Sequence, residues 1–173
     1  MPQSPELWDD YLRRGDAERL RVQRGTNLIH REDCLTEMTS LGFIRWYLHP
    51  KINGPTVRSF YRFELEIPAG SRSGKLFHQG GVIHYVLEGE GYTLVDGVPH
   101  EWETDDVIAI PYRVNGVSFQ HVASGPGPVR LLVTFANLDS ALGPAGGVEM
   151  RVLEPCPEYT GAELSTVRGA TSA

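Results

Sequence analysis

The sequence predicts an all-β, single-domain barrel that carries an N-terminal helical extension. Three observations lead to this prediction. Nineteen glycines and twelve prolines fall between short apolar segments, which is typical of strands joined by many turns. Residues 59–67 alternate apolar and polar side chains, the pattern of a half-buried antiparallel strand. Asp96-Gly97 separates two strand-like runs and indicates a two-residue hairpin turn.

The composition excludes several classes of protein. A net charge of −6, with the basic residues scattered along the chain, argues against a nucleic-acid partner. The N-terminus shows no signal-peptide pattern, and no apolar run approaches the ~20 residues that a membrane helix needs. We therefore expect a cytoplasmic protein with no membrane partner, in which Cys34 and Cys156 are free thiols.

The first helix is expected at residues 4–12. Ser4 suits an N-cap, Pro5 suits the first helical position, and apolar residues follow at i, i+4 spacing. We expect this helix to pack on the outside of the barrel. The segments are predicted as an N-terminal extension over 1–55, the barrel over 56–140 and an extended C-terminal tail over 141–173. Strands are expected at 42–48, 59–67, 92–95, 98–102, 107–110, 118–122 and 129–135.

The stretch 75–91 organises the barrel, because it holds two histidines between strand-like runs, and a third histidine follows on a later apolar strand. The turn at Gly80-Gly81 decides whether His78 and His84 share a face. A two-residue turn would send the two imidazoles to opposite faces of a hairpin, whereas a three-residue turn that includes Gln79 would put both on one face. The second register allows a metal site made by His78, His84 and His121.

This stretch resembles the first motif of the cupin superfamily, a His-x-His pair followed by a glutamate and a Val-Leu-Glu-Gly type of turn. Aligned on Gly89, the second histidine of the motif falls on His78. Its first histidine falls on Leu76 and its glutamate on Val82. The ligand of the second cupin motif corresponds to His121. The resemblance implies a cupin β-barrel, also called a double-stranded β-helix.

Within the superfamily, the pattern from His78 to Val95-Asp96-Gly97 is similar to the gentisate-type ring-cleaving dioxygenases. Their barrels also lack the glutamate and coordinate iron with histidines alone. The resemblance therefore implies a divalent metal ion, Fe(II) first, at His78, His121 and His84. Imidazole ligands also suit zinc and nickel, and manganese remains an alternative.

Each candidate residue also has a structural interpretation. A histidine on an apolar strand often only fills the core, and family members commonly carry an aromatic residue at the position of His84. Arg113, in the long loop at the barrel mouth, is the predicted clamp for a substrate carboxylate. Gln120 is a candidate for orienting a ligand or water.

Three functions remain open at this stage. The first is a non-haem Fe(II) dioxygenase acting on a small aromatic or enolisable carboxylic acid, because a metal held by neutral histidines favours a chelating anion. The second is a redox-neutral metal-dependent isomerase, cyclase or lyase. The third is a metal-free cupin that binds a small molecule, which the apolar residues Leu76 and Val82 favour. A homodimer is expected by analogy with other cupins.

Overall fold

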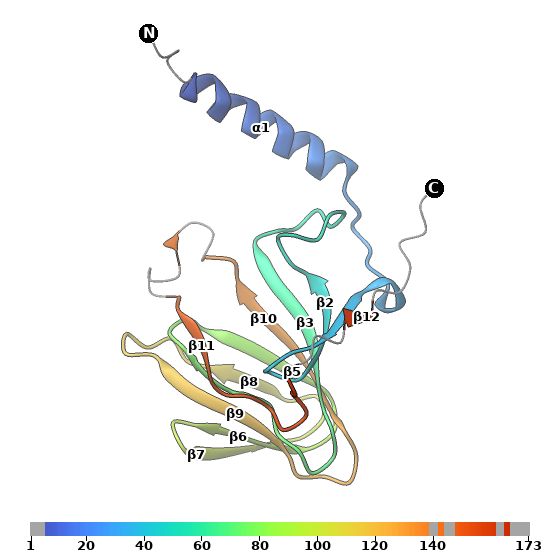
Figure 1. The fold of residues 1–173 in the computed structure, drawn as a ribbon, viewed down its shortest axis with the longest axis vertical. Helices are drawn as coiled ribbons and strands as arrows, with labels where there is room; N and C mark the ends of the chain where they lie inside the picture. Colours follow the sequence, from blue (N-terminus) through green and yellow to red (C-terminus); the bar gives the residue numbers. More distant parts are fainter. Residues whose placement is uncertain (1–5, 139–141, 144–147, 162–164, 167–173) are drawn as a thin grey trace.

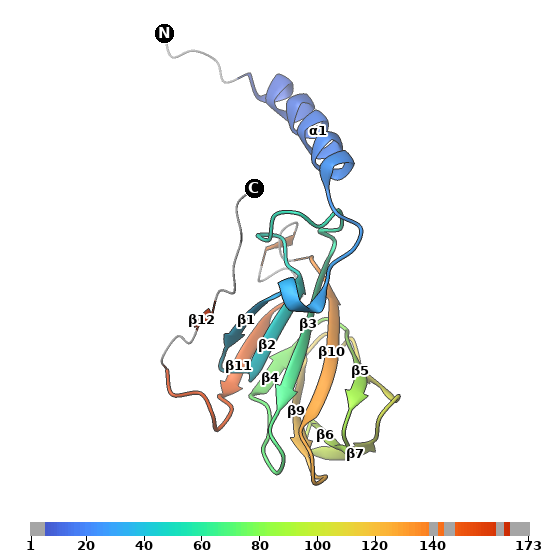
Figure 2. The same cartoon turned by 90° about the vertical axis from the view of Figure 1, so that its right-hand side faces the viewer.

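Two antiparallel sheets face each other and enclose the core (Figures 1 and 2). The computed structural model describes residues 6–138, 142–143, 148–161 and 165–166. The strands of the seven-stranded sheet run in the order β12 (Ser165–Thr166), β1 (Leu35–Met38), β2 (Phe43–Leu48), β3 (Phe60–Ile67), β10 (Val129–Ala136), β5 (Val82–Glu88) and β8 (Val107–Ile110). Those of the five-stranded sheet run β11 (Met150–Glu154), β4 (Lys75–His78), β9 (Val117–Ala123), β6 (Gly91–Val95) and β7 (Val98–Trp102). The predicted all-β class is confirmed.

The core lies between the two sheets and follows directly from the period of two along the strands. On β3, the side chains of Phe63, Leu65 and Ile67 are buried, as the alternation of the sequence predicts. Cross-strand partners on β10 continue the same inner layer, with Leu65 opposite Leu131 and Ile67 opposite Val129. Burial of such aliphatic side chains contributes roughly 1.5–3 kcal/mol each to folding.

The hairpin of β6 and β7 forms at the predicted turn. Val95 pairs with Val98, and the two residues between them have positive φ angles of 49° at Asp96 and 83° at Gly97. Such angles match the right-handed twist of the flanking strands and are tolerated best by aspartate, asparagine and glycine. This hairpin brings Trp102 onto the inner face, where its side chain is buried.

The predicted hairpin between β4 and β5 is wrong. β4 pairs with β9 and β11, whereas β5 pairs with β10 and β8, so the two strands belong to opposite sheets. The glycines 80 and 81 carry the chain from one sheet to the other. Neither pairing register considered for the sequence applies, yet His78 and His84 are both buried between the sheets, 4% and 2% exposed.

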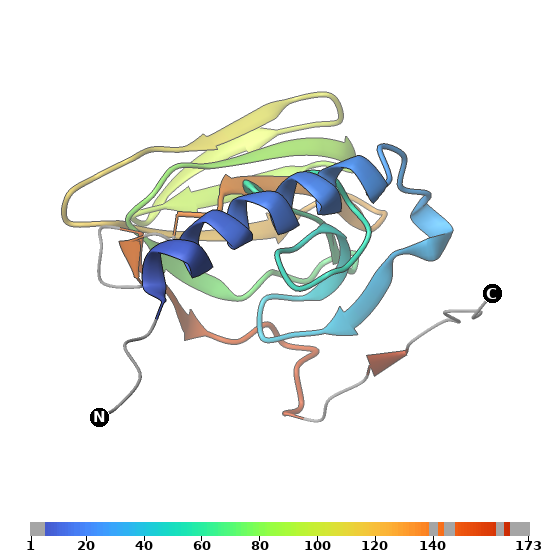
Figure 3. The same ribbon diagram turned by 90° about the horizontal axis from the view of Figure 1, so that it is seen from above.

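The flanking segments also differ from expectation. Helix α1 (Leu7–Arg24) contributes no buried residue and extends away from the barrel instead of packing on it (Figures 1 and 2). Seen from above, it passes across the end of the barrel (Figure 3). Its end is tied down by Arg21, which donates to the carbonyl oxygens of Pro55 and Thr56. The predicted cap residues Ser4 and Pro5 lie outside the described residues. No helix in the described part of the chain combines the length and hydrophobicity needed to cross a bilayer.

The two sheets recruit strands from beyond the predicted barrel limits. β1 and β2 extend the seven-stranded sheet before residue 56, and β11 pairs with β4 after residue 140. A short 3-10 turn, η1 (Arg31–Asp33), precedes β1. Side chains from η1 and from the neighbouring strands β2 and β10, namely Arg31, Tyr47 and Arg130, cover the outer face of β3, where the sequence pattern predicts charged residues in solvent.

Glu64 shows the effect of this cover, because its side chain is only 3% exposed. Arg31 donates two hydrogen bonds to its carboxylate, Arg130 donates one, and Tyr47 donates another. Desolvation alone would raise the pKa of Glu64, but the hydrogen bonds and charges of Arg31 and Arg130 outweigh it and lower the pKa. The N-terminal segment is therefore attached to the barrel by a buried carboxylate.

We expect Glu64→Gln to lower the free energy of unfolding by about 1–3 kcal/mol at pH 7, because it removes the charge that pairs with Arg31 and Arg130. A carboxyl group with a lowered folded pKa stabilises the fold above its unfolded pKa, and this stabilisation disappears as the pH falls through the folded value. The difference from wild type should therefore shrink below about pH 4.5. Urea unfolding across pH measures it, with Glu66→Gln on the same strand as the control; a constant difference down to pH 3 would contradict the assignment.

Candidate functional site

The three candidate histidines, His78, His84 and His121, lie on three different strands, and their side chains are buried between the two sheets. His78 ends β4 and His121 lies in the middle of β9, both in the five-stranded sheet, while His84 lies in the middle of β5. The strict alternation of buried and exposed residues along β5 places His84 on the inner face between Val82 and Val86. His121 has no exposed surface.

His84 and His121 face each other across the barrel, with ring centroids 4.4 Å apart at an interplanar angle of 64°. The Nδ1 atom of His84 and the Nε2 atom of His121 are buried and have no hydrogen-bond partner among the described residues. Burial lowers the pKa of His84 to about 3 and holds that of His121 well below its ordinary value. Both rings are therefore neutral at pH 7, and each presents an unpaired nitrogen to the interior.

The other nitrogen of His121 is held by a short chain of buried polar groups. Thr93 Oγ1 lies 2.8 Å from His121 Nδ1, and Trp102 Nε1 donates to the same hydroxyl oxygen over 2.8 Å. The backbone N–H of His121 donates to Ser73 Oγ over 3.0 Å. Ring and backbone are thus both fixed.

His78 has a defined tautomer. Its Nδ1 lies 3.1 Å from the carbonyl oxygen of Glu149, and because a carbonyl oxygen can only accept, Nδ1 carries the proton. The neutral ring therefore keeps a free lone pair on Nε2. Desolvation lowers the pKa of His78, opposed by this hydrogen bond. A Cβ atom at Gly80 would lie only 3.0 Å from Nε2, so the glycine leaves that nitrogen accessible.

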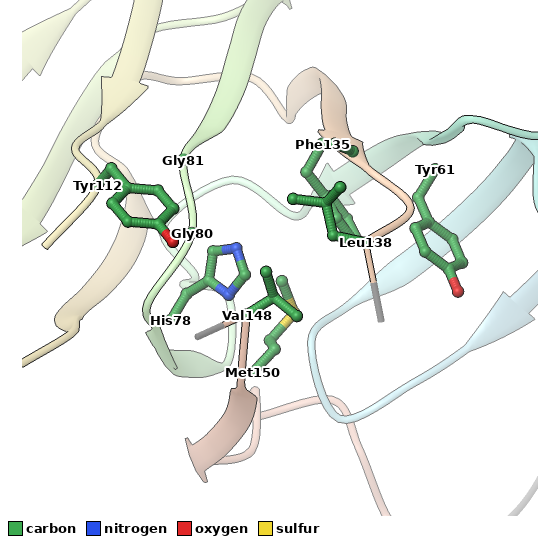
Figure 4. A pocket seen from close by; sticks show the side chains of 10 residues that line it. Tyr61, His78, Gly80, Gly81, Tyr112, Phe135, Leu138, Val148 and Met150 are labelled. Carbon is green, nitrogen blue, oxygen red and sulfur yellow. The ribbon is translucent and has the colours of Figure 1, made fainter. Parts of the chain in front are cut away.

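His78 lines a pocket of about 430 Å³ at the open end of the barrel (Figure 4). The rings of Tyr61 and Phe135 stack at 4.9 Å and 22° on one side, and His78 lies edge-on to Phe135. None of the described residues that line this pocket carries a charged side chain: Tyr61, His78, Gly80, Gly81, Tyr112, Phe135, Ala136, Leu138, Val148 and Met150. The pocket therefore suits a flat, mostly apolar ligand.

The donor set fits a metal ion in part. The unpaired nitrogens of His84 and His121 are the kind of buried orphan atoms that a bound cation would satisfy. His78 is near enough for its charge to lower the pKa of His84. Among the described residues, however, no three His, Cys, Asp or Glu side chains are grouped closely enough to hold an ion together. The three-histidine ligand set therefore stays a proposal.

The other predicted site residues lie elsewhere. Arg113 forms a 2.7 Å ion pair with Asp96 and borders a different pocket, between β7 and β8. Gln120 is buried and donates to the carbonyl oxygen of Ser73 over 2.9 Å. Leu76 and Val82, which occupy the positions of the missing cupin ligands, are buried core residues. Neither Arg113 nor Gln120 is among the described residues that line the pocket of His78, although the backbone N–H of Arg113 donates to the carbonyl oxygen of Gln79 and the preceding Tyr112 lines that pocket.

Two residues of the site were missed by sequence reasoning. Thr93 is fully buried and Trp102 nearly so, and both contribute polar atoms to the environment of His121. A signal was present, because Thr93 is a polar residue at an inward-facing position of an apolar alternating strand. The hairpin register that Asp96-Gly97 defines pairs Trp102 with Gly91, and this places the indole diagonally opposite Thr93, to which it donates.

The profile of the family described as Cupin domain matches residues 63–135. This part of the chain is therefore similar to a cupin domain. The cupin core covers β3 to β10, whereas β1, β2 and β11 are additions on both sides of it. The double-stranded β-helix expected from the sequence is thereby confirmed. No curated protein sequence matches the chain significantly.

Solved structures resemble this chain in fold. The polyketide cyclase RemF from Streptomyces resistomycificus shares 19% identity at a TM-score of 0.56, over 74% of this chain and 85% of that chain. A salicylate 1,2-dioxygenase from Pseudoaminobacter salicylatoxidans, solved as adducts with gentisate, shares 15% identity at a TM-score of 0.52. That match covers 83% of this chain but only 36% of the dioxygenase. At such identities the likeness shows the fold alone.

The buried histidines predict a pH dependence of stability in the metal-free protein. Because the folded pKa of His84 lies near 3, the unfolded chain binds a proton below about pH 6.5 that the folded chain does not. Stability should therefore fall as the pH drops from 6.5 toward 3, by at most about 1.4 kcal/mol per pH unit for each such histidine. Chemical unfolding after chelator treatment measures this slope.

The variant His84→Phe should show a shallower decline over the same pH range, since it lacks the group that titrates only on unfolding. His100→Phe, at an exposed position of β7, is the matched control for replacing an imidazole by a phenyl ring. Equal slopes in wild type and His84→Phe would show that His84 is charged in the folded protein.

Proposed function

We propose that this cupin is a metal-dependent enzyme that acts on a small, uncharged, planar molecule with an aromatic or enolisable ring. The observation that supports this proposal is the facing pair His84 and His121, each of which presents an unpaired nitrogen to the interior. Leaving two such nitrogens buried and unsatisfied costs about 1–3 kcal/mol each, which a bound cation would offset.

His84 Nδ1 and His121 Nε2 would hold the ion, with His78 Nε2 as the third candidate ligand. Neutral imidazoles suit iron, zinc and nickel better than magnesium or calcium. When bound, such an ion supplies a Lewis acid that polarises a carbonyl or phenol oxygen. Both imidazoles are already uncharged at neutral pH, so binding a cation requires no net loss of protons from them.

The pocket argues for a neutral substrate instead of the carboxylic acid expected from the sequence. Its described lining is apolar and aromatic, and Arg113, the predicted carboxylate clamp, is paired with Asp96 elsewhere. A carboxylate buried there without a cation would lose its hydration without compensation. The stacked rings of Tyr61 and Phe135 instead offer a flat wall for an aromatic or polyketone ring.

The favoured reaction class is redox-neutral proton transfer, such as isomerisation or ring closure. With the ion held by His84 and His121 alone, the neutral ring of His78 keeps its lone pair on Nε2 at the pocket wall and can accept a proton from an enolisable carbon or a phenol. The carbonyl of Glu149 would stabilise the resulting imidazolium through Nδ1–H. The solved structure of similar fold that is named a polyketide cyclase, an enzyme of ring closure, adds support by analogy.

A ring-cleaving Fe(II) dioxygenase is the second candidate. It is favoured by the absence of a carboxylate from the proposed donor set, as the sequence resemblance implies. Oxygen consumption in the presence of iron and a phenolic substrate separates the two candidates, because only the dioxygenase needs O₂. The homodimer and the cytoplasmic location stay predictions.

The metal proposal predicts about one equivalent of bound transition metal in the wild-type protein. His121→Ala and His84→Phe should each lose it, since a ligand nitrogen disappears, whereas His100→Ala at an exposed site should retain it. Elemental analysis after purification with and without added iron, zinc or nickel measures the content. A folded wild-type protein that binds none of these ions would leave only the metal-free binding function.

The substrate proposal predicts that the pocket distinguishes ligands by charge. A planar phenol such as 2-naphthol should bind at least tenfold more tightly than the matched carboxylate 2-naphthoate, equivalent to about 1.4 kcal/mol. Phe135→Leu should weaken binding of the phenol several-fold by removing the stacked ring, and Phe60→Leu, exposed on β3, is the matched control. Fluorescence titration measures the affinities; tighter binding of the carboxylate would overturn the neutral-substrate proposal.

A further inference from the structure

The chain Trp102–Thr93–His121 is a buried hydrogen-bonded series that no metal or substrate role requires by itself. The three residues come from β7, β6 and β9, which are neighbours in the five-stranded sheet. The pairing places Thr93 opposite His121 on one side and within reach of Trp102 on the other. Both contacts measure 2.8 Å, and all three side chains are buried.

The chemistry of these groups limits where the hydrogens lie. An indole N–H can only donate, so Trp102 occupies one acceptor position of the Thr93 hydroxyl. Among the described residues, the single group near enough to accept the hydroxyl proton is His121 Nδ1. If Thr93 donates to Nδ1, a neutral His121 carries its own proton on Nε2. That proton points to the interior, where Nε2 has no partner among the described residues.

We propose that Thr93, held in place by Trp102, is a positioning residue that sets both the orientation and the tautomer of His121. In the metal-free protein, Thr93 donates to Nδ1 and His121 presents an N–H to the interior. If the ion of the proposed function were bound at Nε2, a neutral His121 would carry its proton on Nδ1. Nδ1–H would then donate to Thr93 Oγ1, and the hydroxyl hydrogen of Thr93 would have to turn away from the ring.

A hydroxyl group suits this exchange because it can either donate to or accept from the same ring nitrogen. His78 offers the contrast, since the carbonyl oxygen of Glu149 allows only the tautomer with a free Nε2. His78 Nε2 therefore has a free lone pair in the tautomer that the structure allows. His121, in contrast, can hold its proton on Nδ1 or on Nε2, and the Thr93 hydroxyl can hydrogen-bond to either tautomer. Groups that orient a metal-binding histidine in this way typically change metal affinity by 10–100-fold when they are removed.

The test uses Thr93→Val, which removes the hydroxyl and keeps the shape, and Thr93→Ser, which keeps the hydroxyl and removes the methyl group. The first readout is the ¹⁵N chemical shift of both His121 ring nitrogens in the chelator-treated protein. We expect wild type and Thr93→Ser to show predominantly the Nε2–H tautomer, and Thr93→Val to lose that preference. The second readout is the dissociation constant for zinc, expected to weaken roughly 10–100-fold in Thr93→Val and less than about threefold in Thr93→Ser.

The outcomes separate this proposal from the proposed function. Unchanged His121 nitrogen shifts and zinc affinity in a folded Thr93→Val protein would overturn the positioning role. Equal losses in the serine and valine variants would assign the effect to methyl packing and overturn it as well. A wild-type protein that binds no metal would end the proposed function, while the nitrogen shifts would still decide the tautomer.

Trp102→Phe tests the same chain from its other end and remains informative if Thr93→Val fails to fold. Without the indole donor, the Thr93 hydroxyl is held by one bond fewer. We expect a second His121 tautomer to become populated in this variant. Unchanged His121 shifts in folded Trp102→Phe would overturn the part of the proposal that concerns Trp102.

Discussion

Burying imidazoles between two apolar sheet faces is the constraint on which the rest of this molecule depends. The inner layer of Leu65, Leu131 and Val129 excludes water, and that exclusion lowers the pKa of His84 and His121. Each polar atom in such an interior needs a partner or a ligand. The arrangement of Thr93, Trp102 and Ser73 around His121 follows from this need, and so do the two nitrogens left available for chemistry.

The same constraint divides the barrel into two regions. His84 and His121 lie deep, in surroundings where every unpaired donor or acceptor is costly. His78 lies at the wall of a pocket that opens outward between aromatic rings. The described residues that line this pocket include His78 but neither His84 nor His121. The apolar pocket and the deeper pair of imidazoles are therefore two distinct parts of the interior.

The strand pattern could be predicted from the sequence because each strand obeys a local rule. The alternation of β3 and the Asp96-Gly97 turn between β6 and β7 were read correctly for this reason. The pairing partners of β4 and β5 were predicted wrongly, because no local sequence signal distinguishes a Gly-Gly hairpin turn from a Gly-Gly connection between two sheets. The burial of Glu64 could not be predicted for a similar reason, since Arg31, which covers its carboxylate, lies some thirty residues earlier in the chain. Burial of His78, His84 and His121 was anticipated, but their hydrogen-bond partners depend on contacts distant in sequence.

Gly80 has a consequence for how such a site evolves. Its φ angle is not in the positive region that favours glycine, so the backbone itself would accept alanine there. What the position lacks is room, because one added carbon would press against His78 Nε2. A single methyl group at this position would therefore crowd one imidazole nitrogen and leave every strand pairing of the two sheets unchanged. One codon thus controls access to His78 independently of the fold.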